Sequence, residues 1–436
     1  VRRESLRPGD TLSGPAVLVE RHTAIVIEPG WQARITAHDH VALHRVTALS
    51  RDFALGTEAD PVMLEVFNNL YMSIAEQMGA VLENTAASVT IKERLDFSCA
   101  VFDAAGDLIA NAPHMPVHLG SMGASVKTVI AQNPAMKPGD VYVLNAPYNG
   151  GTHLPDITVV TPVWDDAGAE VLFYTSARGH HTDVGGLTPG SMPPDSRDIH
   201  DEGAYIDNWK LVEETRALLL GAKHPVRAVD INMADLRAQV ASCEKGAQEL
   251  RKMVAQFGLE VVQAYMRHVQ DNAEECVRRA IESLKDAELT YQMDPDFDGN
   301  PRQISVKVTV DRAARSARID FTGTTGQLAT NYNAPEPVTR AAVLYVFRLL
   351  VADNIPMNEG VMKPLEVVLP AGTMLSPQYP AAVIAGNVET SQAVTSALLL
   401  ALEVQAAAQS TMNNTTWGDA KYQYYETVCG LSLIHI

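Results

Sequence analysis

The order in which helix-like and strand-like segments follow one another is the strongest constraint on how this chain folds. Residues 64–81 and 236–276 carry apolar side chains at steps of three and four, which predicts long helices. Between and after them, residues 88–177 and 305–321 hold β-branched or aromatic runs bounded by Gly, Pro and Asn. Helices and strands grouped in this way favour an α+β fold over a doubly wound parallel sheet. We therefore expect mixed sheets, a long N-terminal helix and a helical hairpin in a multi-lobed fold.

Local signals indicate where the predicted elements begin and end. Asp60 can cap the first helix, and Pro61 occupies its first turn, where a missing N–H costs nothing. Gly258 interrupts the second apolar stripe, which predicts two antiparallel helices joined there or, alternatively, one kinked helix. Further helices are expected at residues 340–351 and 391–407, a hairpin at 305–310 with 317–321, and short strands at 16–20, 24–28 and 33–36.

The length of 436 residues suggests two or three domains of about 150 residues each. We expect a small β unit at residues 1–50, a core with the candidate site at 51–290 and a second lobe at 291–430. Position 1 is Val and no signal peptide follows it, so we expect the sequence to begin inside a longer reading frame. Residues 431–436 follow without a turn or helix stop, and we expect them to be a non-native addition.

The charge balance argues against two classes of partner. Asp and Glu total 52 against 34 Lys and Arg, a formal net charge of −18. This surplus repels phosphate backbones and anionic lipid, so neither nucleic acid nor a membrane is an expected partner. No apolar stretch approaches the roughly 20 residues that a spanning helix needs. Four scattered Cys residues without a C-x-x-C pair are typical of a reducing compartment and predict a cytoplasmic location.

Histidine and aspartate residues flank two of the predicted strands. His153 and Asp156 precede the strand expected at 157–163, and His180 follows the strand expected at 171–177. If these strands are antiparallel neighbours, the three side chains meet in one pocket. Two imidazoles and a carboxylate suit a divalent transition metal such as Mn²⁺, Fe²⁺, Co²⁺ or Zn²⁺. The alternative is that each is an ordinary solvated or hydrogen-bonded loop residue.

Other polar groups carry weaker signals. His114 and His118 stand four apart, but Pro116 argues against a helix there, so we expect them to line a wall and not to bind a metal. The Asn-rich loops at 331–335 and 386–392 can bind a small polar substrate or simply close turns. No phosphate-binding, dinucleotide-binding or H-E-x-x-H motif is present, so no nucleotide site is expected in this chain.

Taken in order, several motifs resemble the hydantoinase B/oxoprolinase family. They lie at residues 91–98, 111–123, 151–156, 178–186, 190–194, 235–239, 331–335 and 386–392, and the resemblance covers about residues 60–430. Residues 14–35 resemble the closing β segment of the hydantoinase A family. A tail of the A type that runs directly into a B portion is the arrangement of ATP-hydrolysing 5-oxoprolinases.

The resemblance implies an ATP-dependent cyclic amide hydrolase that opens the lactam of 5-oxo-L-proline to give L-glutamate. In the family, ATP-Mg binds to the hydantoinase A-like portion, so we expect this chain to need that portion as a partner and to be inactive alone. The resemblance also implies that the protein forms a homo-oligomer. The alternatives are an N-methylhydantoinase or acetone carboxylase-type B subunit, and a non-catalytic scaffold for the A portion.

The resemblance also assigns roles to residues. Acetone carboxylase relatives bind a metal through His-x-x-Asp and a later His, which correspond to His153, Asp156 and His180. His181 or Asp183 is then expected to act as the catalytic base or as a hydrogen-bonding partner of a ligand. The candidates for substrate contact are His114, His118, Arg178, Asn333 and Asn387.

Overall fold

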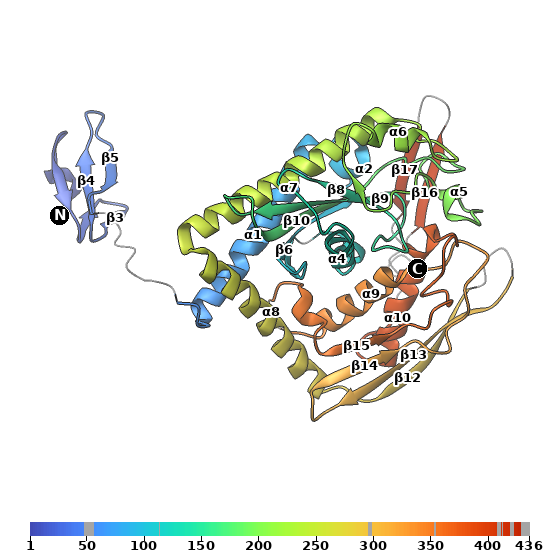
Figure 1. Cartoon of the computed structure of the whole chain (residues 1–436). Coiled ribbons are helices and arrows are strands. Elements are labelled where there is room, and N and C mark those ends of the chain that lie inside the picture. The colour runs from blue at the N-terminus through green and yellow to red at the C-terminus, as the bar shows by residue number, and fades with distance from the viewer. Residues whose placement is uncertain are drawn as a thin grey trace. The chain divides into compact units, whose positions relative to one another are not determined.

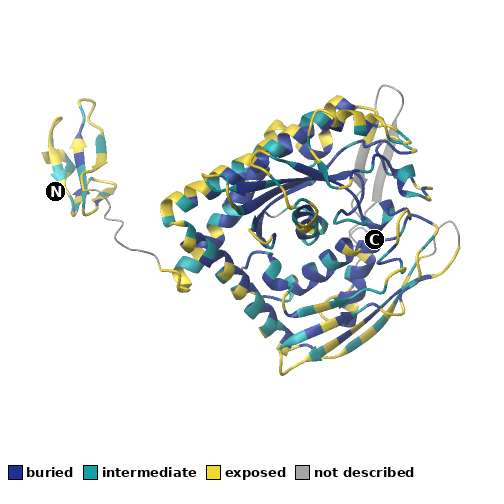
Figure 2. Cartoon of the chain, in the orientation of Figure 1, coloured by how far each residue is buried: buried dark blue, intermediate teal, exposed yellow. Residues whose placement is uncertain are grey.

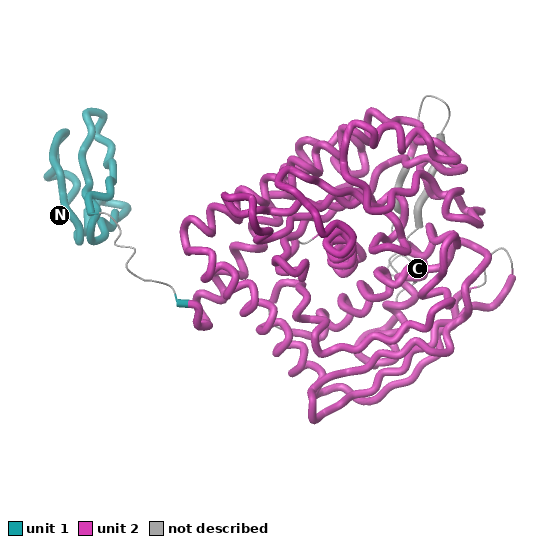
Figure 3. The backbone as a smooth tube through the Cα atoms, viewed as in Figure 1, with its two compact units in different colours: residues 1–56 teal, residues 57–436 magenta. Residues whose placement is uncertain are grey.

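The computed structural model describes residues 1–47, 56–112, 114–294, 299–352, 355–407, 411, 413–418 and 423–428. The chain divides into two compact units, residues 1–56 and 57–436 (Figure 3). The domain boundary expected at residue 290 therefore lies inside the second unit, and residues 431–436 lie outside the described part. Among the described residues, no helix combines the length and apolar character needed to cross a membrane.

The first unit consists of short strands, as predicted. Its three-stranded sheet has the order β1-β4-β5, with bounds Thr11–Ser13, Trp31–Ile35 and Val41–Arg45. A separate hairpin pairs β2 (Ala16–Val19) with β3 (Ala24–Ile27), and a 3-10 turn, η1, spans Arg3–Ser5. Leu18, Ile27, Ala33 and Ile35 are buried and form its small core.

A six-stranded antiparallel sheet is the centre of the second unit. Its order is β11-β8-β9-β10-β6-β7, with bounds Trp209–Lys210, Tyr142–Leu144, Asp156–Trp164, Val171–His180, Phe97–Asp103 and Leu108–Asn111. Helices α1 (Pro61–Thr85) and α7 (Val229–Phe257) cover one face, and α4 (Met122–Gln132) covers the other (Figure 1). Because both faces are covered, the central strands are almost continuously buried (Figure 2).

A second sheet of four strands has the order β12-β13-β14-β15, with bounds Ala287–Met293, Arg302–Asp311, Ser316–Asp320 and Leu365–Val368. The predicted hairpin of β13 and β14 is confirmed, and β15 joins β14 in parallel. Helices α8 (Leu259–Glu282), α9 (Glu336–Leu349) and α10 (Thr390–Ala401) pack in the same apolar core. The remaining elements are α2 (Val89–Lys92), α3 (Pro116–Leu119), α5 (Ile199–Glu202), α6 (Thr215–Leu220), η2 (Glu359–Val361), η3 (Ile384–Gly386), β16 (Asn413–Gly418) and β17 (Gln423–Val428).

The helix ends follow the sequence signals. The Asp60 side chain accepts a hydrogen bond from the Met63 N–H at 2.8 Å and caps α1. Gly258, with a φ of 86°, separates α7 from α8. The two helices diverge from this glycine, and α1 is the helix that packs along α7 (Figure 1). The apolar stripe of α8, which includes Val277 and Ile281, is instead buried against the second sheet.

Candidate metal centre

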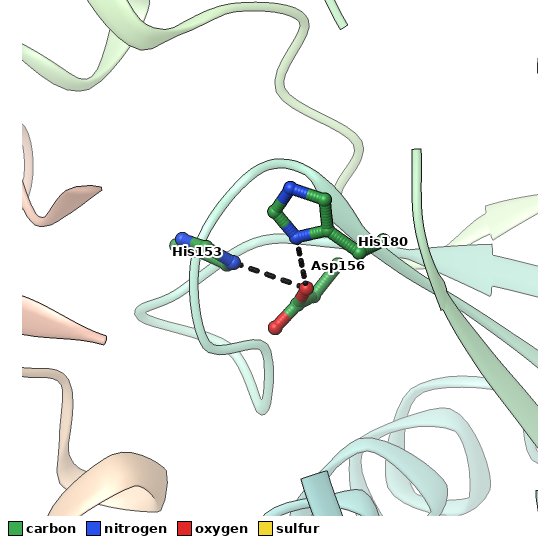
Figure 4. Close-up of side chains that lie close together, drawn as sticks. All are labelled: His153, Asp156 and His180. Carbon is green, nitrogen blue, oxygen red and sulfur yellow. Dashed lines mark hydrogen bonds and ion pairs between the residues drawn. The ribbon is translucent and has the colours of Figure 1, made fainter. Parts of the chain in front are cut away.

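The predicted pairing of the two strands that flank the candidate site is confirmed. β9 and β10 are antiparallel, and their register places Asp156 directly opposite His180. Directly opposed residues project from the same face of a sheet, so these side chains meet. His153, in the turn before β9, completes the group (Figure 4). Its Nε2 and the Nδ1 of His180 each lie 3.0 Å from Oδ1 of Asp156, and the candidate ligand atoms all lie within 4.8 Å of one another.

The triad of His153, Asp156 and His180 is almost completely shielded from solvent, with exposed fractions of 1%, 0% and 4%. Burial alone would raise the pKa of Asp156, but the imidazoles of His153 and His118 hold it well below its usual range. Burial lowers the pKa of His153. Although burial opposes it, the carboxylates of Asp96 and Asp156 raise the pKa of His180, so this imidazole would release a proton on binding a metal, as a ligand histidine must. The triad thus fits a divalent transition metal and leaves coordination positions open.

His118 lies against the triad, although the sequence suggested only a wall residue. Its Nε2 is 3.1 Å from Oδ2 of Asp156, and the Thr152 hydroxyl donates to the same oxygen at 2.9 Å. Pro116 is the first residue of the short helix α3, which contains His118 but not His114, so the two histidines do not share a helix. At that position proline removes no intrahelical hydrogen bond. Thr152 was not predicted, and its only signal was its place beside His153.

Asn387, far along the chain from the triad, also reaches it. Asn387 follows η3, and its Nδ2 lies 3.1 Å from Nε2 of His153 and 3.5 Å from Oδ2 of Asp156. The side chain of Asn333, by contrast, forms hydrogen bonds within its own turn and with the segment just before η3. Its Oδ1 accepts from the Leu328 N–H at 2.8 Å, and its Nδ2 donates to the carbonyl of Ala382 at 3.0 Å. The two Asn-rich loops therefore differ in what their amides contact.

Arg178 lies on the same sheet face as His180, two residues earlier in β10. Its guanidinium is fully buried and donates to the hydroxyls of Thr158 at 2.7 Å, Ser125 at 2.8 Å and Ser121. No carboxylate of the described residues lies within ion-pair distance of it. Burial lowers the pKa of Arg178 to about 10, with Asp156 opposing the shift, so the group remains a cation near the triad.

His181 projects to the opposite face of the sheet and contacts α7. Its Nε2 donates to Oε1 of Gln239 at 3.0 Å, and its Nδ1 accepts from Nδ2 of Asn232 at 3.1 Å. The second N–H of the Asn232 amide donates to the Asp183 carbonyl at 2.8 Å. Both ring nitrogens of His181 are therefore already hydrogen-bonded on the far side of the sheet.

The carboxylate of Asp183 binds backbone groups of the loop that follows β10 and the segment before α7. It accepts from the backbone N–H groups of Gly185, Gly190 and Arg227 at 3.0, 3.1 and 3.1 Å, and from the Arg227 guanidinium at 2.8 Å.

His114 also lies away from the triad: its ring packs on Phe97, next to Gly79 of α1, and its Nδ1 accepts from the Cys99 N–H at 3.2 Å. Burial and the nearby His118 lower the pKa of His114 to about 4.

Solved structures share this architecture. The crystal structure of ATP-dependent caprolactamase from Pseudomonas jessenii matches with a TM-score of 0.72 and 25% identity, over 85% of this chain and 66% of that one. A nucleotide-free acetone carboxylase structure matches with a TM-score of 0.70 and 20% identity, over 79% of this chain and 48% of that one.

Sequence relatives lead to the same family. The 5-oxoprolinase 1 of Arabidopsis thaliana is 41% identical over 459 residues, covering 98% of this chain and 36% of that protein. The 5-oxoprolinase of Dictyostelium discoideum is 40% identical over 438 residues, again over 98% of this chain and 34% of the relative. This chain thus spans about a third of the length of these curated relatives. The family model described as hydantoinase B/oxoprolinase matches residues 60–432, and the chain belongs to this family.

Proposed function

We propose that this chain is the hydantoinase B-type portion of an ATP-dependent 5-oxoprolinase and that its triad is the hydrolytic metal site. The observation that carries the proposal is the convergence of His153, Asp156 and His180 in a chain that aligns over 98% of its length with a 5-oxoprolinase. A divalent metal bound there would lower the pKa of a coordinated water and polarise the activated carbonyl.

In this proposal a hydantoinase A-like portion binds ATP-Mg and phosphorylates the lactam oxygen of 5-oxo-L-proline. Water then adds to the activated carbonyl carbon, and the ring C–N bond breaks as its nitrogen takes a proton and becomes the amine. A second water hydrolyses the resulting acyl phosphate to L-glutamate and inorganic phosphate. The side-chain amide of Asn387, which follows η3, can donate a hydrogen bond next to His153. Arg178 contributes a buried positive charge on the same sheet face, which favours anionic species near the triad.

His181 and Asp183 take supporting roles in this proposal. The hydrogen bonds of His181 to Gln239 and Asn232 attach the residue after β10 to α7. They thereby fix the backbone next to His180, the last residue of β10, whose side chain is part of the triad. Asp183 holds the loop that follows through Arg227. These contacts favour a role in holding the backbone beside the triad over the role of catalytic base, because the polar atoms of both side chains are already hydrogen-bonded elsewhere.

The alternative substrate is another cyclic amide, since the similar solved structure at 25% identity is an ATP-dependent caprolactamase. Assays of the protein assembled with its A-like portion on 5-oxoproline, caprolactam and a hydantoin separate these substrates. ATP-dependent glutamate formation from 5-oxoproline is expected to exceed turnover of the other two. A clear preference for either other substrate would contradict the assignment.

The metal site itself is tested by elemental analysis of the purified chain. We expect Mn, Fe, Co or Zn near one equivalent in the wild type, and loss of the metal in His153→Ala and Asp156→Asn. His268→Ala on α8 is the matched control and should retain the metal. If the wild type contains no such metal and His153→Ala leaves turnover of the assembled protein unchanged, the chain acts as a scaffold instead.

A further inference from the structure

The two oxygens of Asp156 face different sets of residues. Oδ1 lies 3.0 Å from both His153 Nε2 and His180 Nδ1, the nitrogens of the candidate ligands. Oδ2 lies 3.1 Å from His118 Nε2 and accepts from the Thr152 hydroxyl at 2.9 Å. The carboxylate is therefore divided: one oxygen belongs to the ligand set, and the other is bound by protein donors.

The partners of His118 determine which of its nitrogens carries the proton. A carboxylate oxygen can only accept, so Nε2 must donate to Oδ2 of Asp156. In the neutral ring Nδ1 then presents a lone pair, and the Ser98 hydroxyl lies 3.2 Å away, where it can donate. Ser98 and His118 have exposed fractions of 0% and 1%. A directed chain of hydrogen bonds thus runs from Ser98 through His118 to Asp156.

The start of this chain is held rigidly. Ser98 is in β6, and its register places it directly opposite Arg178 of β10. His118 reaches the same face from α3, and Thr152 comes from the turn that also carries His153. Together with Asn387, whose Nδ2 lies 3.5 Å from Oδ2, three separate segments contact the same carboxylate oxygen. Both nitrogens of His118 are used within the protein, which argues against direct contact with substrate.

We propose that His118 is a positioning residue that makes Asp156 a one-oxygen metal ligand. This inference rests on the proposed metal site. Carboxylates bind metals through one oxygen or both, and a hydrogen bond on the second oxygen fixes both the plane of the group and the oxygen that remains available. His118 does this from outside the ligand set, because its nitrogen faces Oδ2 and the ligand nitrogens face Oδ1.

Titration of the metal-free full chain with Co²⁺, followed by visible absorption, tests the proposal without an activity assay. Wild type should bind Co²⁺, and His153→Ala should not. His118→Ala should still bind, but about 10–100-fold more weakly, which is the usual effect of losing a group that supports a ligand. Its absorption bands should also shift, because Oδ2 of Asp156 keeps its Thr152 and Asn387 contacts but loses the His118 N–H, which lets this oxygen approach the metal.

Two more variants make the test specific. His118→Gln can place an amide N–H near the position of Nε2 and should restore both affinity and spectrum in part. Ser98→Ala leaves His118 in place but removes its donor, and should shift both readouts in the same direction by a smaller amount. If circular dichroism shows that His118→Ala does not fold, the Ser98→Ala variant alone tests whether these hydrogen bonds influence Asp156.

Several results would overturn the proposal. Wild-type affinity and spectrum in folded His118→Ala, or in Ser98→Ala if His118→Ala is unfolded, would show that the hydrogen bonds have no influence on Asp156. Complete loss of Co²⁺ binding in folded His118→Ala, as in His153→Ala, would make His118 a ligand and not a positioning residue. Absence of Co²⁺ binding by the wild type would refute the metal site itself, which is a distinguishable outcome.

Discussion

Replacing Gln239 with alanine should remove three buried hydrogen bonds at once. Gln239 lies on α7 with an exposed fraction of 0%. Its Nε2 donates to the carbonyls of Ile157 at 2.8 Å and Ala177 at 2.9 Å, and its Oε1 accepts from His181. One side chain therefore joins α7 to β9, to β10 and to the residue next to His180.

The size of the effect follows from the groups left behind. Gln239→Ala leaves two carbonyls and one imidazole N–H without these partners, and each such buried group costs about 1–3 kcal/mol. Because the vacated space allows some rearrangement, we expect a loss of roughly 3–6 kcal/mol in the free energy of unfolding. That is a large part of the roughly 5–15 kcal/mol that stabilises a typical domain. Gln239→Glu should be worse, since a carboxylate would face two carbonyl oxygens.

Urea unfolding followed by circular dichroism measures this loss. Gln248→Ala is the matched control, because Gln248 is on the same helix but exposed, where it contacts Glu244 at 3.3 Å. The control should change the unfolding free energy by less than about 0.5 kcal/mol. If Gln239→Ala loses no more than this control, the amide does not connect α7 to the sheet as described.

Two further changes test other parts of the second unit. Burial raises the pKa of Glu202 from its usual 4.5 to about 8, so the folded chain holds an extra proton between these values and stability falls as pH rises through that window. Glu202→Gln should remove up to about 4 kcal/mol of this decline, measured as the difference in unfolding free energy between about pH 5 and pH 8; an unchanged pH dependence would exclude Glu202 as its source. A Cβ on Gly386 would lie 1.9 Å from the Asn333 carbonyl oxygen, so Gly386→Ala should cost about 1–3 kcal/mol in thermal melts. Gly123→Ala on α4, where the nearest atom is 3.8 Å away, should be neutral or slightly stabilising, and equal melting temperatures for the two variants would contradict the predicted clash.

The sequence allowed β9 and β10 to be located to within a few residues, because β-branched runs there are bounded by Gly, Pro and His residues. Antiparallel pairing then brought His153, Asp156 and His180 together, as expected. The direction of His181 was not predictable in the same way. The strand was expected to end at residue 177, whereas β10 continues to His180. Because side chains alternate between the two faces along an extended chain, His180 points toward the triad and the next residue, His181, points to the other face.

The place of His118 was also beyond the sequence argument. Pro116 reads as a helix breaker when its position in a helix is unknown, and only the structure puts it at the first residue of α3. Likewise, the residue motif at 235–239 marked Gln239 without indicating its partners. A periodic stripe identifies which side of a helix is buried, but not which carbonyls of a distant sheet lie beneath a polar side chain.

The direct pairing of Asp156 with His180 restricts where this chain can change in length. β9 and β10 are joined by a short turn at residues 165–170. Inserting or deleting one residue within the paired strands would turn one of the two side chains to the opposite face and separate them. Additions to the turn leave the pairing intact. Insertions and deletions at residues 165–170 of this hairpin should therefore be tolerated. A single insertion or deletion between Asp156 and Val163, or between Phe173 and His180, should separate the triad side chains.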